Sequence, residues 1–207
     1  KKGRGGYRLG HDKVYDHMML DGLEDAYEEG RSMGTFGEDC AAKYHFTREA
    51  QDHFAMTSVK RAQQAIAQGA FKDEITPVTV KERKGERVVD TDEGPGRINV
   101  EKIPALRPAF KKDGTITAAA SSSINDGAAA VVLMTESRAR ELGLKPLARI
   151  VSYATHAQEP GWFTTAPVPA SQKALEKAGW KVEDVDLWEV NEAFAVVPMA
   201  LMHVMKV

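Results

Sequence analysis

Cysteine is the scarcest functional residue of this chain, with only Cys40 among 207 residues. A single cysteine excludes an internal disulfide framework and any zinc site built from cysteines. Long hydrophobic runs are missing as well. The longest, residues 193–202, holds Pro198 and is too short to span a bilayer. The first residues are basic and glycine-rich, without the apolar stretch of a signal peptide.

An excess of either charge is also lacking. The 28 basic and 30 acidic residues give a net charge of −2, which argues against a nucleic-acid partner. The hydrophobic share of 43% is enough to fill a core. We therefore expect a soluble, cytoplasmic protein with one generous domain or two small ones, and no membrane partner.

The first part of the chain shows no regular alternation of elements. Residues 1–13 form a basic, glycine-rich arm. Apolar spacing then predicts helices over 15–27, from Thr35 to about 44, and from Thr47 to 68, the last closed by Gly69. Further on, the pattern predicts strands at 75–80 and 87–89, a turn at 92–96, and extended segments at 106–110 and 115–117.

The second part alternates strands and helices. Apolar runs predict buried strands at 128–134, 147–153 and 185–190. Helices are expected over 136–142 and 170–178 and from residue 193, with a kink at Pro198, and residues 160–169 are expected to be an irregular loop. This order predicts an α/β architecture with a mainly parallel sheet, preceded by a separate α+β module over 1–123.

Two polar residues lie where the last expected strand passes into the last helix. Ligand groups gather at such places in open α/β sheets, so Asn191 could orient a water or a carbonyl group. Alternatively, Asn191 and Glu192 serve only to cap the helix. Both interpretations remain open from the sequence. Residues 118–123 are all small and permit close approach of another element or a ligand.

The segment Asn191-Glu-Ala-Phe-Ala195 resembles a motif of the thiolase family. Other segments resemble acetyl-CoA acetyltransferases of that family in the same order. They are Gly5-Gly-Tyr-Arg-Leu-Gly10, Asp21-Gly-Leu23, Met33-Gly34, Thr47-Arg-Glu-Ala-Gln-Asp52, Phe71-Lys-Asp-Glu-Ile75, Leu106-Arg-Pro-Ala-Phe110, Ile124-Asn-Asp-Gly-Ala-Ala-Ala130 and Lys173-Ala-Leu-Glu-Lys-Ala-Gly-Trp180. The resemblance extends over essentially the whole chain.

The resemblance implies a thiolase fold, a duplicated α/β core with an inserted α+β loop domain, present as a partial chain. Residues 1–123 would be the loop domain, used by relatives for tetramerisation and coenzyme A binding. Residues 124–145 would end the N-terminal core half and 146–207 would begin the C-terminal half. We therefore expect the chain to match the central portion of such an enzyme, with both catalytic cysteines and the catalytic histidine outside it.

The activity implied is acyl transfer between coenzyme A esters: condensation of acetyl-CoA to acetoacetyl-CoA, or thiolysis of 3-ketoacyl-CoA, as in fatty acid metabolism. A cysteine acyl-enzyme divides the reaction into two steps. The resemblance implies a homo-oligomer, dimer or tetramer, with coenzyme A thioesters as substrates and no permanently bound cofactor or metal. The alternative is a non-catalytic fragment that binds coenzyme A or forms oligomers.

The resemblance also assigns site residues. Asn191 would hold a water in an oxyanion hole, and Ser122 would contact the pantetheine amide. The remaining positions would line the substrate path: Leu23, Met33, Phe110, Ala118, Ala193 and Phe194. Arg97, for the adenosine phosphate, and His156, in a loop facing the cleft, are further candidates.

Two features depart from the family. Arg31-Ser32 stands where relatives carry an aromatic residue and a histidine, so the usual histidine contact to coenzyme A is missing here. Cys40 occupies a position that is usually apolar, and no histidine or asparagine pattern marks it as activated. We expect Cys40 to be a packed structural thiol and the isolated chain to be inactive.

Overall fold

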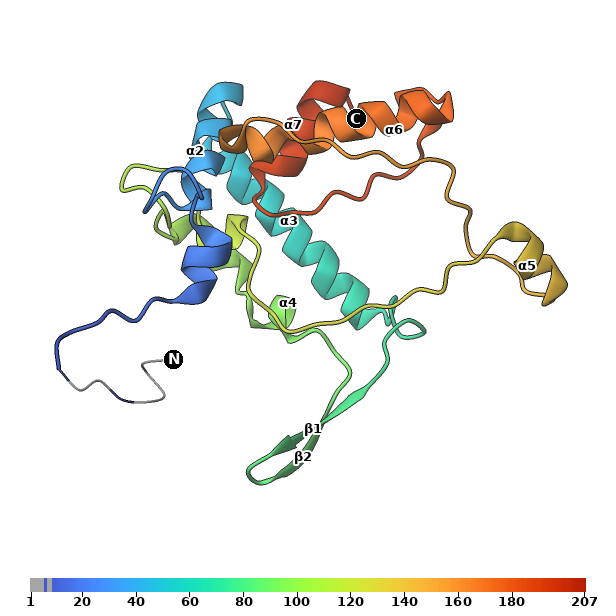
Figure 1. The fold of residues 1–207 in the computed structure, drawn as a ribbon, viewed down its shortest axis with the longest axis horizontal. Helices are drawn as coiled ribbons and strands as arrows, with labels where there is room; N and C mark the ends of the chain where they lie inside the picture. Colours follow the sequence, from blue (N-terminus) through green and yellow to red (C-terminus); the bar gives the residue numbers. More distant parts are fainter. Residues whose placement is uncertain (1–5, 7–8) are drawn as a thin grey trace.

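Three helices form the centre of the structure, a computed structural model that describes residue 6 and residues 9–207. They are α2 (Met33–Tyr44), the long α3 (Arg48–Ala67) and the C-terminal α7 (Val196–Met205), with α6 (Pro167–Ala178) packed against α7 (Figure 1). The main core lies between them. It contains Cys40, Ala41, Ile116, Ala120, Phe194, Ala195, Val196, Val197 and Ala200.

The helix predicted over 15–27 is much shorter than expected. A π-helix, η1, covers only Met19–Leu23. Glu24 is then extended and forms an antiparallel bridge with Ser32. The carboxylate of Asp25 accepts hydrogen bonds from the backbone amides of Tyr27 and Glu28, which stabilises a turn instead of a helix. The basic arm predicted over 1–13 falls in part on residues 1–5 and 7–8, outside the described residues.

The next two helices follow the prediction closely. Thr47 accepts a hydrogen bond from the Ala50 amide at 3.2 Å and caps α3, as expected. Gly69 adopts the predicted left-handed conformation, with φ of +67°. The predicted cap of α2 at Thr35 is wrong, because the helix begins at Met33 and Ser32 occupies its N-cap position.

Two strands follow α3, as the sequence predicted, with bounds shifted by two or three residues, and they form a hairpin. Strands β1 (Val78–Glu82) and β2 (Gly85–Val89) pair antiparallel, with Val80 opposite Arg87. The predicted turn at 92–96 is instead the short helix α4 (Glu93–Arg97), because Asp92 accepts a hydrogen bond from the Gly94 amide and caps it. The 3₁₀ helices η2 (Val100–Ala105) and η3 (Ala118–Ala120) lead toward the second half.

The parallel sheet predicted for the second half is not formed by the described residues, whose one sheet is the β1–β2 hairpin. Residues 128–134, 147–153 and 185–190 run without strand partners, and most of their large apolar side chains are exposed. The strand prediction is therefore wrong for all three. A strand needs a neighbour at hydrogen-bonding distance, and the described chain places none beside these segments.

The helices of the second half agree better with the sequence. Thr135 caps α5 (Glu136–Glu141), as predicted. The predicted loop at 160–169 instead contains the 3₁₀ helix η4 (Pro160–Thr165) and the first turn of α6, which begins at Pro167 because proline suits the first helical position. A short 3₁₀ helix, η5 (Val182–Asp184), comes next.

Pro198 lies in the first turn of α7, where backbone amides have no partner within the helix. Proline at this position removes no hydrogen bond of the helix, so it gives no reason for the predicted kink. No helix among the described residues combines the length and the apolar character needed to cross a membrane.

Candidate functional site

The segment that precedes α7 is bound to the run of small residues predicted to permit close approach. The Ser122 amide donates to the carbonyl oxygen of Ala193 at 2.9 Å, and the Ala195 amide donates to that of Ala120 at 2.9 Å. Ser121 and Phe194 form an antiparallel bridge. Residues 120–122 and 193–195 thus run side by side, because alanine and serine side chains leave room for the two backbones.

Two aromatic rings extend this contact into α2. The Phe110 and Phe194 rings meet edge to face, with centroids 5.7 Å apart. Phe194 is buried, whereas Phe110 is half-buried. The Phe110 ring lies against Gly34, the neighbour of Met33. The bridge between Glu24 and Ser32 brings Leu23 to the start of the same helix.

The structure brings four of the residues assigned by resemblance together, namely Phe110, Ser122, Ala193 and Phe194. Leu23 and Met33 adjoin this group along the chain, as neighbours of Glu24 and Gly34, and Ala118 is exposed at the start of η3. We call the group of four the α2–α7 wall. It combines aromatic and apolar surface with a serine hydroxyl.

Gly34 makes the α2–α7 wall sensitive to one added methyl group. An ideal Cβ at Gly34 would lie 2.1 Å from Phe110 Cγ. We expect Gly34→Ala to lower the free energy of unfolding by about 1–3 kcal/mol, because the clash outweighs the helical preference for alanine. Urea unfolding followed by circular dichroism measures the change. Gly96→Ala in α4 is the control, since its Cβ would meet nothing within 4 Å. Equal effects at the two glycines would contradict the packing shown here.

The helix-capping interpretation of Asn191 and Glu192 is wrong. The N-cap of α7 is Ala195, and no side chain caps the helix. Glu192 instead accepts a hydrogen bond at 2.7 Å from Ser58 on α3, and its carbonyl oxygen accepts one from Ser122 Oγ at 2.7 Å. Asn191 is exposed, and its side-chain amide has no hydrogen bond to any described residue. Its interpretation as an orienting group remains a prediction.

Two further candidates make their polar contacts away from the α2–α7 wall. Arg97 is exposed on α4 and forms an ion pair with Glu93. His156 is half-buried beside α6, with Nδ1 3.0 Å from Lys173 Nζ and Nε2 3.1 Å from Gln158 Oε1. The structure does not bring either residue to the wall.

Arg31, which departs from the family pattern, is occupied by its own chain. Its guanidinium donates to Glu28 and Asp39, both at 2.6 Å, and lies 3.8 Å above the centre of the Phe36 ring. The residue therefore ties the loop after η1 to α2.

Sequence reasoning missed a buried carboxylate beneath the wall. Glu38 on α2 accepts hydrogen bonds from the Thr115 amide at 2.8 Å, from the Ile116 amide at 2.9 Å and from Thr115 Oγ1 at 2.9 Å. Glu38 thereby fixes the segment that leads into residues 118–122. The one available signal in the sequence was the Asp113-Gly114 turn. In the structure an ideal Cβ at Gly114 would lie 2.3 Å from Glu38 Oε1, so the carboxylate approaches a position that holds glycine.

Cys40 is fully buried in the core, and burial raises the pKa of its thiol. We expect the native thiol to react with a disulfide reagent at least about tenfold more slowly than the unfolded chain. Because the pKa is higher in the folded chain, the unfolded chain loses the thiol proton at a lower pH than the folded chain does. The free energy of unfolding should therefore fall as the pH rises past about 8.5, and this fall should be absent in Cys40→Ala. Stopped-flow thiol titration with and without urea tests the rate. Equal rates would mean that the thiol is accessible.

Within residue 6 and residues 9–207, no three His, Cys, Asp or Glu side chains come together in a way that could hold a metal ion. The apolar surface and the serine hydroxyl of the α2–α7 wall suit a thin, mainly apolar ligand with hydrogen-bonding groups more than a highly charged one.

Comparisons with known proteins show which family the sequence matches. The thiolase N-terminal domain family matches residues 1–137, and the thiolase C-terminal domain family matches residues 144–207. An acetyl-CoA acetyltransferase of Paracoccus denitrificans is 51% identical over 197 residues, which are 95% of this chain and 50% of the relative. A probable acetyl-CoA acetyltransferase of Dictyostelium discoideum is 50% identical over 96% of this chain and 48% of the relative.

Two solved acetyl-CoA acetyltransferase structures are similar to this chain in fold and in sequence. The crystal structure of the Bacillus anthracis acetyl-CoA acetyltransferase superimposes with a TM-score of 0.92 at 43% identity, covering 100% of this chain and 52% of that one. The Syntrophomonas wolfei acetyl-CoA acetyltransferase gives 0.86 at 41% identity. The chain spans about half the length of the curated relatives it matches.

Proposed function

This chain belongs to the thiolase family, and from that premise we propose that it forms the pantetheine-binding part of an acyl-CoA acyltransferase. The reaction is condensation of acetyl-CoA to acetoacetyl-CoA, or its reversal by thiolysis of a 3-ketoacyl-CoA. The structural likeness confirms the fold class predicted from the sequence, a thiolase fold present in part.

The pairing of residues 120–122 with 193–195 carries this proposal. It brings the hydroxyl of Ser122 and the ring of Phe194 to one wall, with Phe110 beside them. Pantetheine is a thin chain with amide groups between apolar segments, which suits such a wall. Ser122 Oγ uses its one hydrogen on the Glu192 carbonyl oxygen, so its lone pairs are left to accept from a ligand amide.

Asn191 provides the catalytic part of the proposal. In condensation a cysteine thiolate attacks the thioester carbonyl of acetyl-CoA and releases coenzyme A; in thiolysis it attacks the 3-keto carbonyl and releases acetyl-CoA after cleavage of the C2–C3 bond. In both directions negative charge develops on the oxygen of the attacked carbonyl. A water held by the free amide of Asn191 would donate to that oxygen. The nucleophilic cysteine is proposed to lie outside this chain, because Cys40 is buried in the core.

A chimera tests the proposal directly. Residues 1–207 replace the matching part of the Bacillus anthracis acetyl-CoA acetyltransferase, and thiolysis of acetoacetyl-CoA is measured. We expect turnover by the chimera, unchanged by Cys40→Ala, and none by the isolated chain. A folded chimera without turnover overturns the acyltransferase proposal. If that chimera still binds coenzyme A, the non-catalytic alternative replaces it.

Three finer proposals accompany the activity: acetyl-CoA metabolism linked to fatty acids, a cytoplasmic location, and a homo-oligomer of two or four subunits. The first residues and the acidic stretch after them resemble the region through which relatives associate. Light scattering on the chimera measures its assembly state. A strictly monomeric chimera would contradict the proposed homo-oligomer.

A further inference from the structure

Ser58 connects α3 to the segment that carries Asn191. Its hydroxyl donates to Glu192 Oε2 at 2.7 Å, across 134 positions of the sequence. Ser58 is half-buried and lies four residues after Phe54, which packs against the main core. Residues four positions apart lie on the same face of a helix. The face of α3 that presents Ser58 is therefore anchored in the core.

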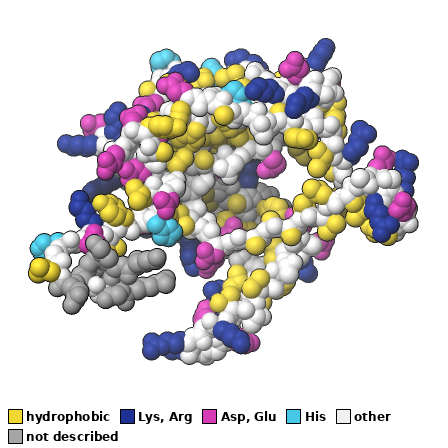
Figure 2. Space-filling view, in the orientation of Figure 1, with side chains coloured by type: hydrophobic (Ala, Val, Ile, Leu, Met, Phe, Trp, Pro, Cys, Tyr) yellow, Lys and Arg dark blue, Asp and Glu magenta, His cyan; other side chains and the backbone are white. Residues whose placement is uncertain are grey.

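The direction of the Glu192 side chain depends on this hydroxyl. None of the ion pairs among the described residues includes Glu192. Figure 2 shows the Lys and Arg side chains of this face mostly toward the ends of the molecule, such as the tip of the β1–β2 hairpin and α5. An exposed carboxylate without a cationic partner samples several rotamers. The hydrogen bond from Ser58 selects the rotamer that points to α3.

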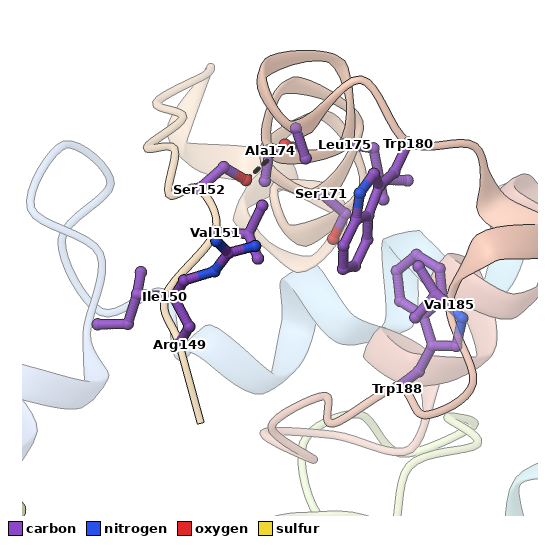
Figure 3. A pocket seen from close by; sticks show the side chains of 11 residues that line it. Arg149, Ile150, Val151, Ser152, Ser171, Ala174, Leu175, Trp180, Val185 and Trp188 are labelled. Carbon is purple, nitrogen blue, oxygen red and sulfur yellow. Dashed lines mark hydrogen bonds between the residues drawn. The ribbon is translucent and has the colours of Figure 1, made fainter. Parts of the chain in front are cut away.

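Asn191 lies between two residues whose positions are fixed. Before it, Val190 packs against the main core and against a second apolar cluster formed by α6 and α7. The same segment contains Trp188, which lines a groove of about 420 Å³ beside α6 (Figure 3). After Asn191, the backbone carbonyl oxygen of Glu192 accepts from Ser122 Oγ at 2.7 Å. The side-chain amide of Asn191 has no hydrogen bond to the described residues, so its place is set by these neighbours.

We propose that Ser58 is a positioning residue for Asn191, an inference that rests on the proposed function. Two hydrogen bonds hold Glu192 from different directions, one on its carbonyl oxygen from Ser122 and one on its side chain from Ser58. Together they restrict rotation of the backbone next to Asn191. The Asn191 amide is thereby kept where it holds the water of the oxyanion hole, and small displacements of such a group lower the rate.

Ser58→Ala in the chimera tests the proposal. We expect kcat for thiolysis of acetoacetyl-CoA to fall about tenfold while KM changes less than about twofold, because Asn191 acts on charge that forms in the transition state. The midpoint of thermal unfolding should stay within about 3 °C, since an exposed hydrogen bond adds little stability. An unchanged kcat overturns the proposal. A change in KM alone assigns Ser58 to binding and overturns it as well.

Thr57→Ala is the matched control. Thr57 precedes Ser58 on α3 and is also half-buried, but its hydroxyl donates within the helix, to the carbonyl oxygen of His53 at 2.8 Å. The kcat of the Thr57→Ala chimera should stay within about twofold of the kcat of the unchanged chimera. An equal loss of kcat in the two variants would show a general effect on α3 and would overturn the positioning role.

Glu192 provides a second test from the other partner of the bond. Glu192→Ala should lower kcat about tenfold, whereas Glu192→Gln keeps an oxygen that accepts from Ser58 and should recover most of this loss. Ser58→Ala added to Glu192→Ala should lower kcat no further, because both substitutions remove the same hydrogen bond. A further tenfold loss in the double variant would show that the two residues act separately, contrary to the proposal.

The double variant of Ser58→Ala with Asn191→Ala shows whether the effect passes through Asn191. Its kcat should equal that of Asn191→Ala alone, since no amide is left to position. A further loss overturns the inference. The two proposals also fail differently. A folded chimera without turnover overturns the acyltransferase activity and, with it, the positioning of Asn191. Turnover that Asn191→Ala lowers and Ser58→Ala leaves unchanged overturns this inference alone.

Discussion

Asn191→Ala in the chimera should lower kcat for thiolysis of acetoacetyl-CoA by about 100-fold, while KM changes less than about twofold. The effect falls on kcat because the proposed water-mediated contact strengthens only when charge forms on the reacting oxygen. Steady-state kinetics give both constants. Thermal unfolding of the variant shows whether its fold is kept, and this is expected because Asn191 is exposed and has no hydrogen bond to the described residues.

Asn125→Ala is the matched control for that measurement. Asn125 is also exposed, and its amide donates only to Ser123. The kcat of the Asn125→Ala chimera should stay within about twofold of the kcat of the unchanged chimera. A rise in KM for Asn191→Ala without a loss of kcat would assign this residue to binding and would contradict its place in an oxyanion hole.

Glu38→Ala should lower the free energy of unfolding by about 3 kcal/mol. The substitution leaves the half-buried amide of Thr115 and the buried amide of Ile116 without their acceptor, at about 1–3 kcal/mol each, and the helical preference of alanine offsets only part of this. Urea unfolding of the 207-residue chain measures the loss. Because Glu38 fixes the segment that leads into Ser122, weaker coenzyme A binding by the chimera should accompany it.

The next residue along α2 supplies the control. Asp39 is exposed and pairs with Arg31 at the surface, so Asp39→Ala should cost at most about 1 kcal/mol. Glu38→Gln keeps one oxygen that can accept from the two amides and should recover about half of the loss. If Glu38→Ala and Asp39→Ala cost the same, the carboxylate does not hold residues 115–116 in place.

Local signals determined much of the helical structure. Thr47 and Thr135 cap their helices, because the hydroxyl oxygen of a residue before a helix accepts a hydrogen bond from a backbone amide of the first turn. This bond does not depend on residues far away in the chain. The β1–β2 hairpin was predicted for the same reason, since its turn and strands are neighbours in sequence. The predicted helix over 15–27 was wrong because a local competitor, the Asp25 carboxylate, stabilises a turn.

Apolar runs determined which segments are strand-like but not whether they pair. Residues 128–134 carry the composition of a buried strand and are nevertheless exposed here. Pairing depends on a second strand, which no single run of residues contains. The motif resemblance correctly indicated the family, and it also suggested residues such as Arg97 and His156 that the structure places away from the wall.

What the sequence determined by itself is therefore the family, the capped helices and the two strands of the hairpin. Tertiary structure alone decided that Asn191 is free and does not cap α7, that Phe110 meets Phe194, and that Glu38 holds the approach to Ser122. These contacts join residues far apart in the chain. Their geometry depends on how α2, α3 and α7 pack together, and no local pattern of residues encodes that packing.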